Sequence, residues 1–221
     1  MAKHPDWDRL QKLMPAVRDF QRLATEHGID DVFQDNGGKI LQMLLALNLQ
    51  GIPGREGNDA VDVEGREYEL KSVNIWLTSG FSTNHHVNIP IINKYRKARW
   101  VFAIYEGIEM RRAFFVPSGK LEEHFSRWEK QWTETGKDIN NPKIPLRFVC
   151  DRGECLFDDG EPLDLEVAAA IRRERTKASA DRRKAKAQAA TTLARTDPAA
   201  GDNPIGLMLG RRKRPPNSRP E

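Results

Sequence analysis

Residues 51–75 constrain the fold more than any other part of the chain, because alternating residues bracket a turn at Glu64-Gly65. This pattern predicts a β-hairpin. With a three-residue loop that places Gly65 at the positive-φ position, the two strands have one register. That register pairs Asp62 with Arg66, Val61 with Glu67, Ala60 with Tyr68 and Asp59 with Glu69. A two-residue loop would turn Asp59 to the opposite face, so the loop length decides which side chains meet.

Glu69 and Lys71 lie two residues apart on the second strand, and they therefore project from the same face. The side chains expected to point the other way, into packing, are Tyr68, Leu70 and Ser72. With Asp59 opposite Glu69, two carboxylates would face each other beside one lysine. Hydrolysis of a phosphodiester bond needs charge stabilisation and a deprotonated water, which a divalent ion held by carboxylates supplies. The candidate Mg²⁺ ligands are Asp59 and Glu69, and Lys71 would orient or deprotonate the water.

By itself, the spacing of Asp59, Glu69 and Lys71 is weak evidence for catalysis. A solvated strand with Glu and Lys two residues apart is common in a chain of which 31% is charged. Both the catalytic and the solvated interpretation therefore remain open on spacing alone.

The remaining periodicity predicts an α/β (α+β) domain on a mixed β-sheet flanked by helices. Helices are expected over residues 6–27, with Pro15 as a possible break and Gly28 as a stop, and over 39–49 after a Gly37-Gly38 turn. Further elements are expected as strands at 100–107, 111–117 and 144–150, and as a helix at 121–133.

The composition divides the chain in two. Residues 1–160 are expected to form one catalytic and recognition domain, and 161–221 a basic Ala/Arg-rich extension, a frayed helix followed by disorder. Residues 171–221 carry fourteen Lys and Arg against five Asp and Glu, a charge of +9, which leaves −5 for residues 1–170 of a chain with net charge +4. The extension could attract phosphate or could be an inert, solvated tail.

Cys150 and Cys155 are expected to be free thiols, since neither a zinc ligand set nor an oxidising compartment is indicated. The chain contains no apolar run of about 18 residues, and its polar first residues do not fit a signal peptide. We therefore expect a cytoplasmic protein without a membrane partner.

Six segments resemble the PvuII-type restriction endonucleases of the PD-(D/E)xK superfamily, in the same order and over roughly residues 4–157. They are FQDNGGKILQ, PGREGNDAVD, EYELKSVNI, GFSTNHHVN, KYRKARWVFAIY and KDINNPKIP. The resemblance implies a homodimer, dimerising through helices at about residues 6–49, that cuts both strands of double-stranded DNA with Mg²⁺. It also implies the palindrome CAGCTG cut centrally to blunt ends, and a cognate DNA methyltransferase in the same system but not in a stable complex.

By the same resemblance, Asp59, Glu69 and Lys71 match the catalytic residues. Positions that match base contacts are Ser82, His85, His86, Asn140 and Asn141, while Asp35 matches a minor-groove position and Tyr95 a position near the cleaved phosphate. Hydroxyl, imidazole and amide groups can read base edges in the major groove, although the histidines alone would suit a surface loop and the asparagines a turn. One departure is Asn84, where the family has the first of three consecutive histidines.

Two other functions remain open. One is a repair or junction-resolving nuclease on the same fold, since the fold does not fix the substrate. The other is a sequence-specific DNA-binding protein that has lost catalysis, against which the intact Asp59, Glu69 and Lys71 argue.

Overall fold

The computed structural model describes residue 4, residues 6–52 and residues 58–196, with side chains up to residue 188. The chain forms two compact units, Met1–Arg175 and Thr176–Glu221, and each is described by itself. The disorder predicted at the end of the chain falls on residues 197–221, outside the described residues. Gly57, next to the hairpin, also lies outside them. Within the described chain every helix is too short or too polar to span a bilayer.

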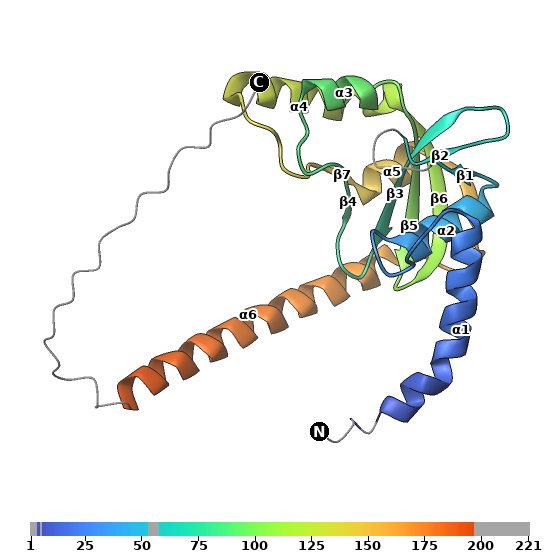
Figure 1. Ribbon diagram of the computed structural model, residues 1–221. Coiled ribbons are helices and arrows are strands. Elements are labelled where there is room, and N and C mark those ends of the chain that lie inside the picture. The colour runs from blue at the N-terminus through green and yellow to red at the C-terminus, as the bar shows by residue number, and fades with distance from the viewer. Residues whose placement is uncertain (1–3, 5, 53–57, 197–221) are drawn as a thin grey trace, which may run out of the picture. The chain divides into compact units, whose positions relative to one another are not determined.

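The first unit is built on a six-stranded sheet in the order β1-β2-β3-β5-β6-β8 (Figure 1). Neighbouring strands are antiparallel except β3 and β5, which are parallel, so the sheet is mixed as predicted. Its strands are β1 (Gln50–Gly51), β2 (Ala60–Val61), β3 (Glu67–Asn74), β5 (Arg99–Glu106), β6 (Glu109–Pro117) and β8 (Glu154–Asp158). A separate two-stranded sheet pairs β4 (Gly80–Ser82) with β7 (Lys143–Pro145).

The central strand β5 is buried on both faces, as its unbroken apolar run predicted. Trp100 and Phe102 pack on one side with Phe125 of α4 (Glu122–Thr135), which follows a short 3-10 turn, η1 (Ser118–Leu121). Val101 and Tyr105 pack on the other side with α2 (Gly37–Ala46). The sheet therefore carries a hydrophobic cluster on each face.

The N-terminal helices differ in detail from the prediction. Helix α1 (Trp7–Glu26) continues through Pro15, where a break was possible; Pro15 is exposed, so water can bond the carbonyl that its missing N–H leaves unpaired. Gly28, at a φ of 76°, follows the helix end as expected. Gly37 begins α2 rather than a turn before it, and a Cβ there would lie 2.5 Å from the Asp31 carbonyl oxygen. The glycine allows the preceding loop to approach the helix.

The prediction of a strand over residues 144–150 is wrong. Only Lys143–Pro145 is strand, and α5 (Leu146–Arg152) follows. Pro145 has extended backbone angles and precedes the helix, and Leu146 and Val149 are buried at a spacing of three. A short apolar run fits a buried strand or a buried helix equally well, which is why periodicity alone misassigned it.

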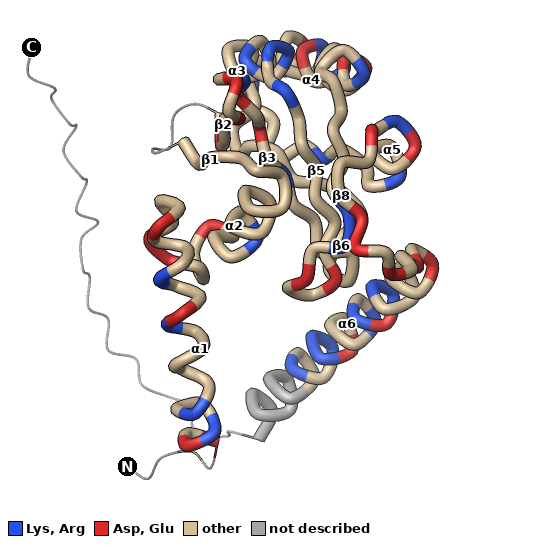
Figure 2. The backbone as a smooth tube through the Cα atoms, turned by 90° about the vertical axis from the view of Figure 1, so that its right-hand side faces the viewer, with Lys and Arg blue, Asp and Glu red and all other residues tan. Residues whose placement is uncertain are grey.

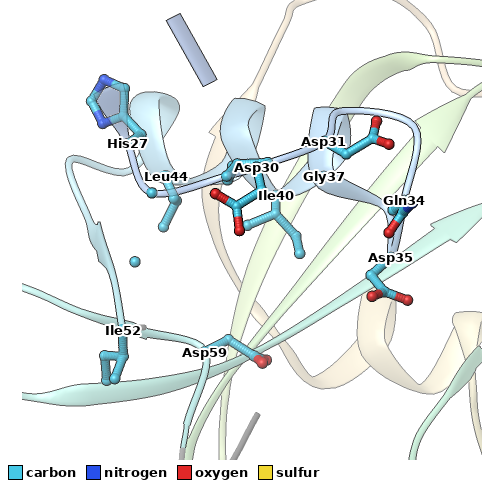
Figure 3. A pocket seen from close by; sticks show the side chains of 13 residues that line it. His27, Asp30, Asp31, Gln34, Asp35, Gly37, Ile40, Leu44, Ile52 and Asp59 are labelled. Carbon is cyan, nitrogen blue, oxygen red and sulfur yellow. The ribbon is translucent and has the colours of Figure 1, made fainter. Parts of the chain in front are cut away.

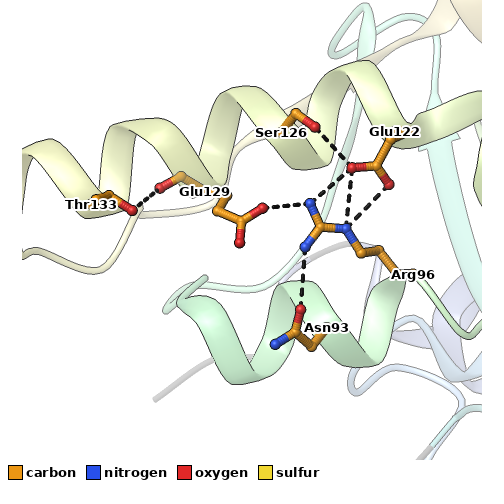
Figure 4. A network of polar contacts seen from close by, with 6 residues as sticks. All are labelled: Asn93, Arg96, Glu122, Ser126, Glu129 and Thr133. Atoms are coloured by element: carbon orange, nitrogen blue, oxygen red, sulfur yellow. Dashed lines mark hydrogen bonds and ion pairs between the residues drawn. The ribbon is translucent and has the colours of Figure 1, made fainter.

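Helix α3 (Ile89–Tyr95) is fastened to α4 by a network around Arg96 (Figure 4). The Arg96 guanidinium donates to Glu122 at 2.8 Å and to Glu129 at 2.5 Å, and it also donates to Asn93 of α3. Hydrogen bonds from Arg96 outweigh the slight burial of Glu122 and lower the pKa of its carboxyl. The network holds α3, and with it Tyr95, against the rest of the unit.

The first part of α6 (Leu165–Thr196) belongs to the first unit. Ala168 is 1% exposed in the main core, and Leu163 and Leu165 pack against that core. Arg172 donates from Nη1 to the carbonyl of Ile75, just beyond the end of β3. The extension therefore begins with residues that help to build the sheet domain, while a division of function at residue 160 remains a prediction.

Candidate active site

A cleft of about 370 Å³ brings three parts of the chain together. The loop before α2, and α2 itself, contribute Asp35, Asn36, Ile40 and Met43. The hairpin contributes Asp59, Leu70, Lys71 and Ser72. The segments around β4 and β7 contribute Ser82, Thr83, His85 and Asn141. Two candidate catalytic residues and four candidate DNA-contacting residues thus line one cavity.

The hairpin has the predicted register, with Ala60 opposite Tyr68 and Gly65 at a φ of 77°. Asp59 Oδ2 accepts a hydrogen bond of 2.7 Å from the backbone N–H of Leu70. Because that N–H lies between Glu69 and Lys71 in the sequence, the strand itself anchors the Asp59 carboxylate beside them. The hypothesis that Asp59 and Glu69 face each other beside Lys71 required this three-residue loop.

Lys71 lies between the two carboxylates. Its Nζ is 2.6 Å from Glu69 Oε1 and 3.9 Å from Asp59 Oδ2. Glu69 is only 6% exposed, whereas the Asp59 side chain is 38% exposed and lines the cleft. The group therefore has a buried inner carboxylate, a lysine and an outer carboxylate that faces solvent.

Burial raises the pKa of Glu69 above its ordinary value, and the charge of Asp59 adds to this rise. Lys71 and Lys94 oppose it, because positive charge stabilises the ionised carboxylate. Burial, followed by the charges of Glu69 and Asp59, also raises the pKa of Tyr95 on α3. The two carboxylates form a concentrated negative site that a cation would stabilise.

The other face of β3 was expected to pack in the core, and only part of it does. Tyr68 and Leu70 are buried in the core with α2, as predicted. Ser72, expected to pack in the same way, is half-buried and lines the cleft. The cleft reaches this face of the strand, so the hydroxyl of Ser72 is available to a ligand.

Asp62 stabilises the hairpin turn and does not line the cleft. Its carboxylate accepts hydrogen bonds from the N–H groups of Glu64 and Arg66, the Arg66 side chain and the Tyr68 hydroxyl. Desolvation tends to raise its pKa, but these bonds outweigh it and hold the pKa of Asp62 well below its usual range.

Substituting Asp62→Asn is expected to lower the melting temperature at pH 7. A depressed pKa in the fold means that ionised Asp62 stabilises the protein above the unfolded-state pKa of about 3.9, and that this stabilisation declines as pH falls towards the lowered value. The difference in melting temperature between variant and wild type should therefore shrink below about pH 4. Thermal unfolding followed by circular dichroism from pH 7 to pH 2 measures it, and a constant difference would contradict this account.

The wall opposite the hairpin is made by two segments about 60 residues apart in the sequence. Ser82 pairs with Lys143 between β4 and β7, and Val87 forms a bridge with Ile139. The Thr83 hydroxyl donates to the Pro142 carbonyl at 2.7 Å. These contacts place Ser82, His85 and Asn141 along one side of the cleft.

Asn84, where the resembled family has histidine, serves this wall as a turn residue. Its carbonyl accepts from the Asn141 N–H at 3.0 Å, and its side chain accepts from the His86 N–H at 2.9 Å. Asn141 has a φ of 50°, and its side-chain Nδ2 lies 3.4 Å from the Ser82 hydroxyl. Its Oδ1 is buried without a hydrogen-bond partner among the described residues. An unsatisfied acceptor beside the cleft suits a ligand that donates a hydrogen bond.

Four of the candidate residues do not line the cleft. Glu69 lies behind Lys71, and Tyr95 is 3% exposed in the core, against Trp100. His86 and Asn140 are exposed on the loops outside the cavity. Conversely, sequence reasoning missed the lining residues Asn36, Ile40, Met43 and Thr83. The Asn36-Gly37 pair was a usable sign, since Asn36 has a φ of 64°, a conformation that asparagine adopts more readily than most residues.

A second pocket of about 430 Å³ adjoins the cleft and shares Asp35, Ile40 and Asp59 with it. Figure 3 shows the carboxylates of Asp30, Asp31, Asp35 and Asp59 around this space. The side of the cleft formed by the loop before α2 together with Asp59 is therefore strongly negative. A polyanion could approach it only with positive charge from elsewhere.

A metal ion would have few protein ligands here. Among the described residues no group of three or more His, Cys, Asp or Glu is arranged to hold a metal. Asp59 and Glu69 offer hard oxygen donors on either side of Lys71. This donor set fits Mg²⁺, which keeps several waters and binds through one or two carboxylates plus substrate phosphate.

Comparison with known protein families agrees with this arrangement. The family model described as restriction endonuclease PvuII matches residues 5–157, which include every residue of the cleft. Membership implies a nuclease that hydrolyses DNA. The chain belongs to the PvuII family of restriction endonucleases.

Proposed function

We propose that this chain is a Mg²⁺-dependent type II restriction endonuclease that cuts both strands of CAGCTG at its centre, leaving blunt ends. One observation carries the proposal: a single cleft joins Asp59 and Lys71 to Ser82, His85 and Asn141. Groups suited to hydrolysis line one side, and groups suited to base recognition line the other. The palindrome and the position of the cut come from the family resemblance.

Mg²⁺ held by Asp59 and Glu69 would stabilise charge on the phosphoryl oxygens and make a bound water more acidic. Lys71 donates to Glu69 and faces the cleft, so its ammonium can orient the attacking water and offset charge in the transition state. The Leu70 N–H keeps Asp59 in place while this happens. Tyr95 lies near the cleaved phosphate by resemblance, and its raised pKa keeps its hydroxyl protonated.

Base recognition would come from Ser82, His85 and Asn141 in the cleft, with His86 and Asn140 on the adjoining loops. Histidine and serine can donate to guanine N7 and O6, and asparagine can bind an adenine edge through two hydrogen bonds. Asp35 lines the cleft on the side of α2, and by resemblance it lies towards the minor groove.

Substituting Asn141→Ala or His85→Ala should reduce discrimination between the cognate site and a site with one changed base pair by about ten- to a hundredfold. Each good base contact contributes about 1–3 kcal/mol of discrimination. Competition binding with cognate and single-mismatch duplexes in Ca²⁺ measures the ratio without cleavage. Equal loss of affinity for cognate and random DNA would instead mark these residues as phosphate contacts.

A homodimer is proposed because a two-fold palindrome is most simply read by a two-fold protein. The exposed apolar side chains of α1 support it: Trp7, Leu10, Leu13, Phe20 and Leu23 are 38–56% exposed. Sedimentation at working concentration should give the mass of two chains. A monomer that still cuts both strands in one encounter would contradict the dimer.

Incubating the purified protein with Mg²⁺ and a plasmid that contains one CAGCTG site tests the function. Sequencing of the ends should show blunt cuts at the centre of that site. Cuts at branched DNA only would favour a repair or junction-resolving nuclease, and binding to the site without cutting would favour an inactive DNA-binding protein. A cytoplasmic location and a cognate methyltransferase that protects host DNA complete the proposal.

A further inference from the structure

Residues 176–188 of α6, here called the basic segment, lie outside both the family match and the first unit. Its positive side chains are Lys177, Arg182, Arg183, Lys184 and Lys186, and its single carboxylate is Asp181. Every residue of the segment is exposed. Figure 2 shows Lys and Arg recurring along this helix. A helical segment whose side chains are all exposed does not contribute to a hydrophobic core.

The five cations of the basic segment form no ion pair with any carboxylate of the described residues. Exposed cations on two other helices are paired within their own helix. Lys130 pairs with Glu134 in α4, and Arg147 pairs with Asp151 in α5. The basic segment therefore presents uncompensated positive charge on a regular helical surface.

Residues 1–175 carry a net negative charge. Residues 176–221 carry eleven Lys and Arg against four Asp and Glu, a charge of +7, which leaves −3 for residues 1–175 of the +4 chain. Within that negative body, Asp30, Asp31, Asp35 and Asp59 surround the space beside the cleft. A phosphate backbone that approaches the cleft meets repulsion, which positive charge elsewhere in the same chain would offset.

We propose that the basic segment binds the phosphate backbone of duplex DNA without regard to sequence, so that the enzyme is retained on DNA while it searches for its site. The inference rests on the proposed function in so far as DNA is the substrate. Charge complementarity identifies the partner: the segment offers cations with no aromatic side chain and no apolar side chain larger than alanine, which suits phosphate rather than base edges or a protein groove.

The test replaces all five cations in the full-length protein: Lys177→Gln, Arg182→Gln, Arg183→Gln, Lys184→Gln and Lys186→Gln. Glutamine has a helix propensity close to that of lysine and arginine, so the helix is retained and circular dichroism can verify it. The matched control exchanges Lys and Arg at the same five positions and keeps the charge. Binding to a 30-base-pair duplex that lacks CAGCTG is measured against salt concentration.

The slope of log affinity against log salt should fall by about 0.9 for each phosphate that the glutamine variant no longer neutralises, and by about 2 or more in total. The control should retain the wild-type slope. An unchanged slope in the glutamine variant overturns the proposal. Because this assay needs no cleavage, an inactive chain with the expected slopes would refute the proposed function and leave this inference intact.

Discussion

Replacing either Asp59 or Lys71 with alanine is expected to reduce cleavage of the CAGCTG plasmid by at least about a hundredfold to ten-thousandfold. The Asp59 change removes the cleft-facing carboxylate that the Leu70 N–H anchors. The Lys71 change removes the ammonium 2.6 Å from Glu69 and leaves that buried carboxylate without its partner. General acid-base and electrostatic groups contribute rate factors of about this size. Single-turnover cleavage with each protein in excess over DNA measures the chemical step.

Glu64→Gln is the matched control for these variants. Glu64 lies in the same hairpin, but its side chain is exposed and, within the described part of the chain, forms an ion pair with Arg66 alone, so cleavage should stay within about twofold of wild type. Asp62 is unsuitable as a control, because its substitution disturbs the turn that sets the register. Wild-type turnover in either Asp59→Ala or Lys71→Ala would refute the assignment of the active site.

Ending the chain after Leu163 is expected to destabilise the nuclease domain by about 3 kcal/mol or more. The cut removes Leu165 and Ala168 from the core and Arg172 from the carbonyl of Ile75. Full burial of a leucine side chain contributes about 1.5–3 kcal/mol, and a hydrogen bond to a charged group contributes about as much. Half-buried Leu165, buried Ala168 and the Arg172 hydrogen bond together therefore account for about 3 kcal/mol, a large part of a typical total of about 5–15 kcal/mol. Urea unfolding followed by tryptophan fluorescence measures the free energy of unfolding.

Ending the chain after Arg175 instead should leave this free energy within about 1 kcal/mol of wild type, since the packing of Leu165 and Ala168 and the Arg172 hydrogen bond are retained. Equal stability of the two truncated proteins would show that residues 164–175 do not support the sheet. The comparison matters for the basic segment as well. A cut at Leu163 would remove this charge together with Leu165, Ala168 and Arg172, whereas a cut after Arg175 removes the charge and keeps those three residues.

The hairpin is the part of the fold that could be predicted best from the sequence. Its register could be predicted because Gly65 fixes the turn and the alternation on both strands fixes the faces, and all of this information is local. The apolar run at residues 144–150 carried no such marker, so its helix was missed. Ser72 was misjudged because alternation gives the face of a strand but does not indicate where a cavity reaches it.

The assembly of the cleft was beyond local patterns. Ser82 and Asn141 could each be named from the family resemblance, but no periodicity indicates that their side chains approach within 3.4 Å. The same holds for Arg172, whose bond to Ile75 spans 97 residues. Each such contact joins two residues that are far apart in the sequence. It depends on how the elements between them, among them α3, α4 and β5, pack in the fold.

The pairing of β4 with β7 also bears on the order in which the protein folds. The hairpin that holds Asp59 and Glu69 closes a loop of a few residues, whereas joining Ser82 to Lys143 closes one of about 60 residues, at a greater entropic cost. Contacts distant in sequence tend to form late. A folding φ-value compares the effect of a mutation on the folding rate with its effect on stability. We therefore expect high folding φ-values in the hairpin and low ones at Phe81 and Ile144. During refolding, the hydrolytic side of the cleft would then form before the side that discriminates between sequences.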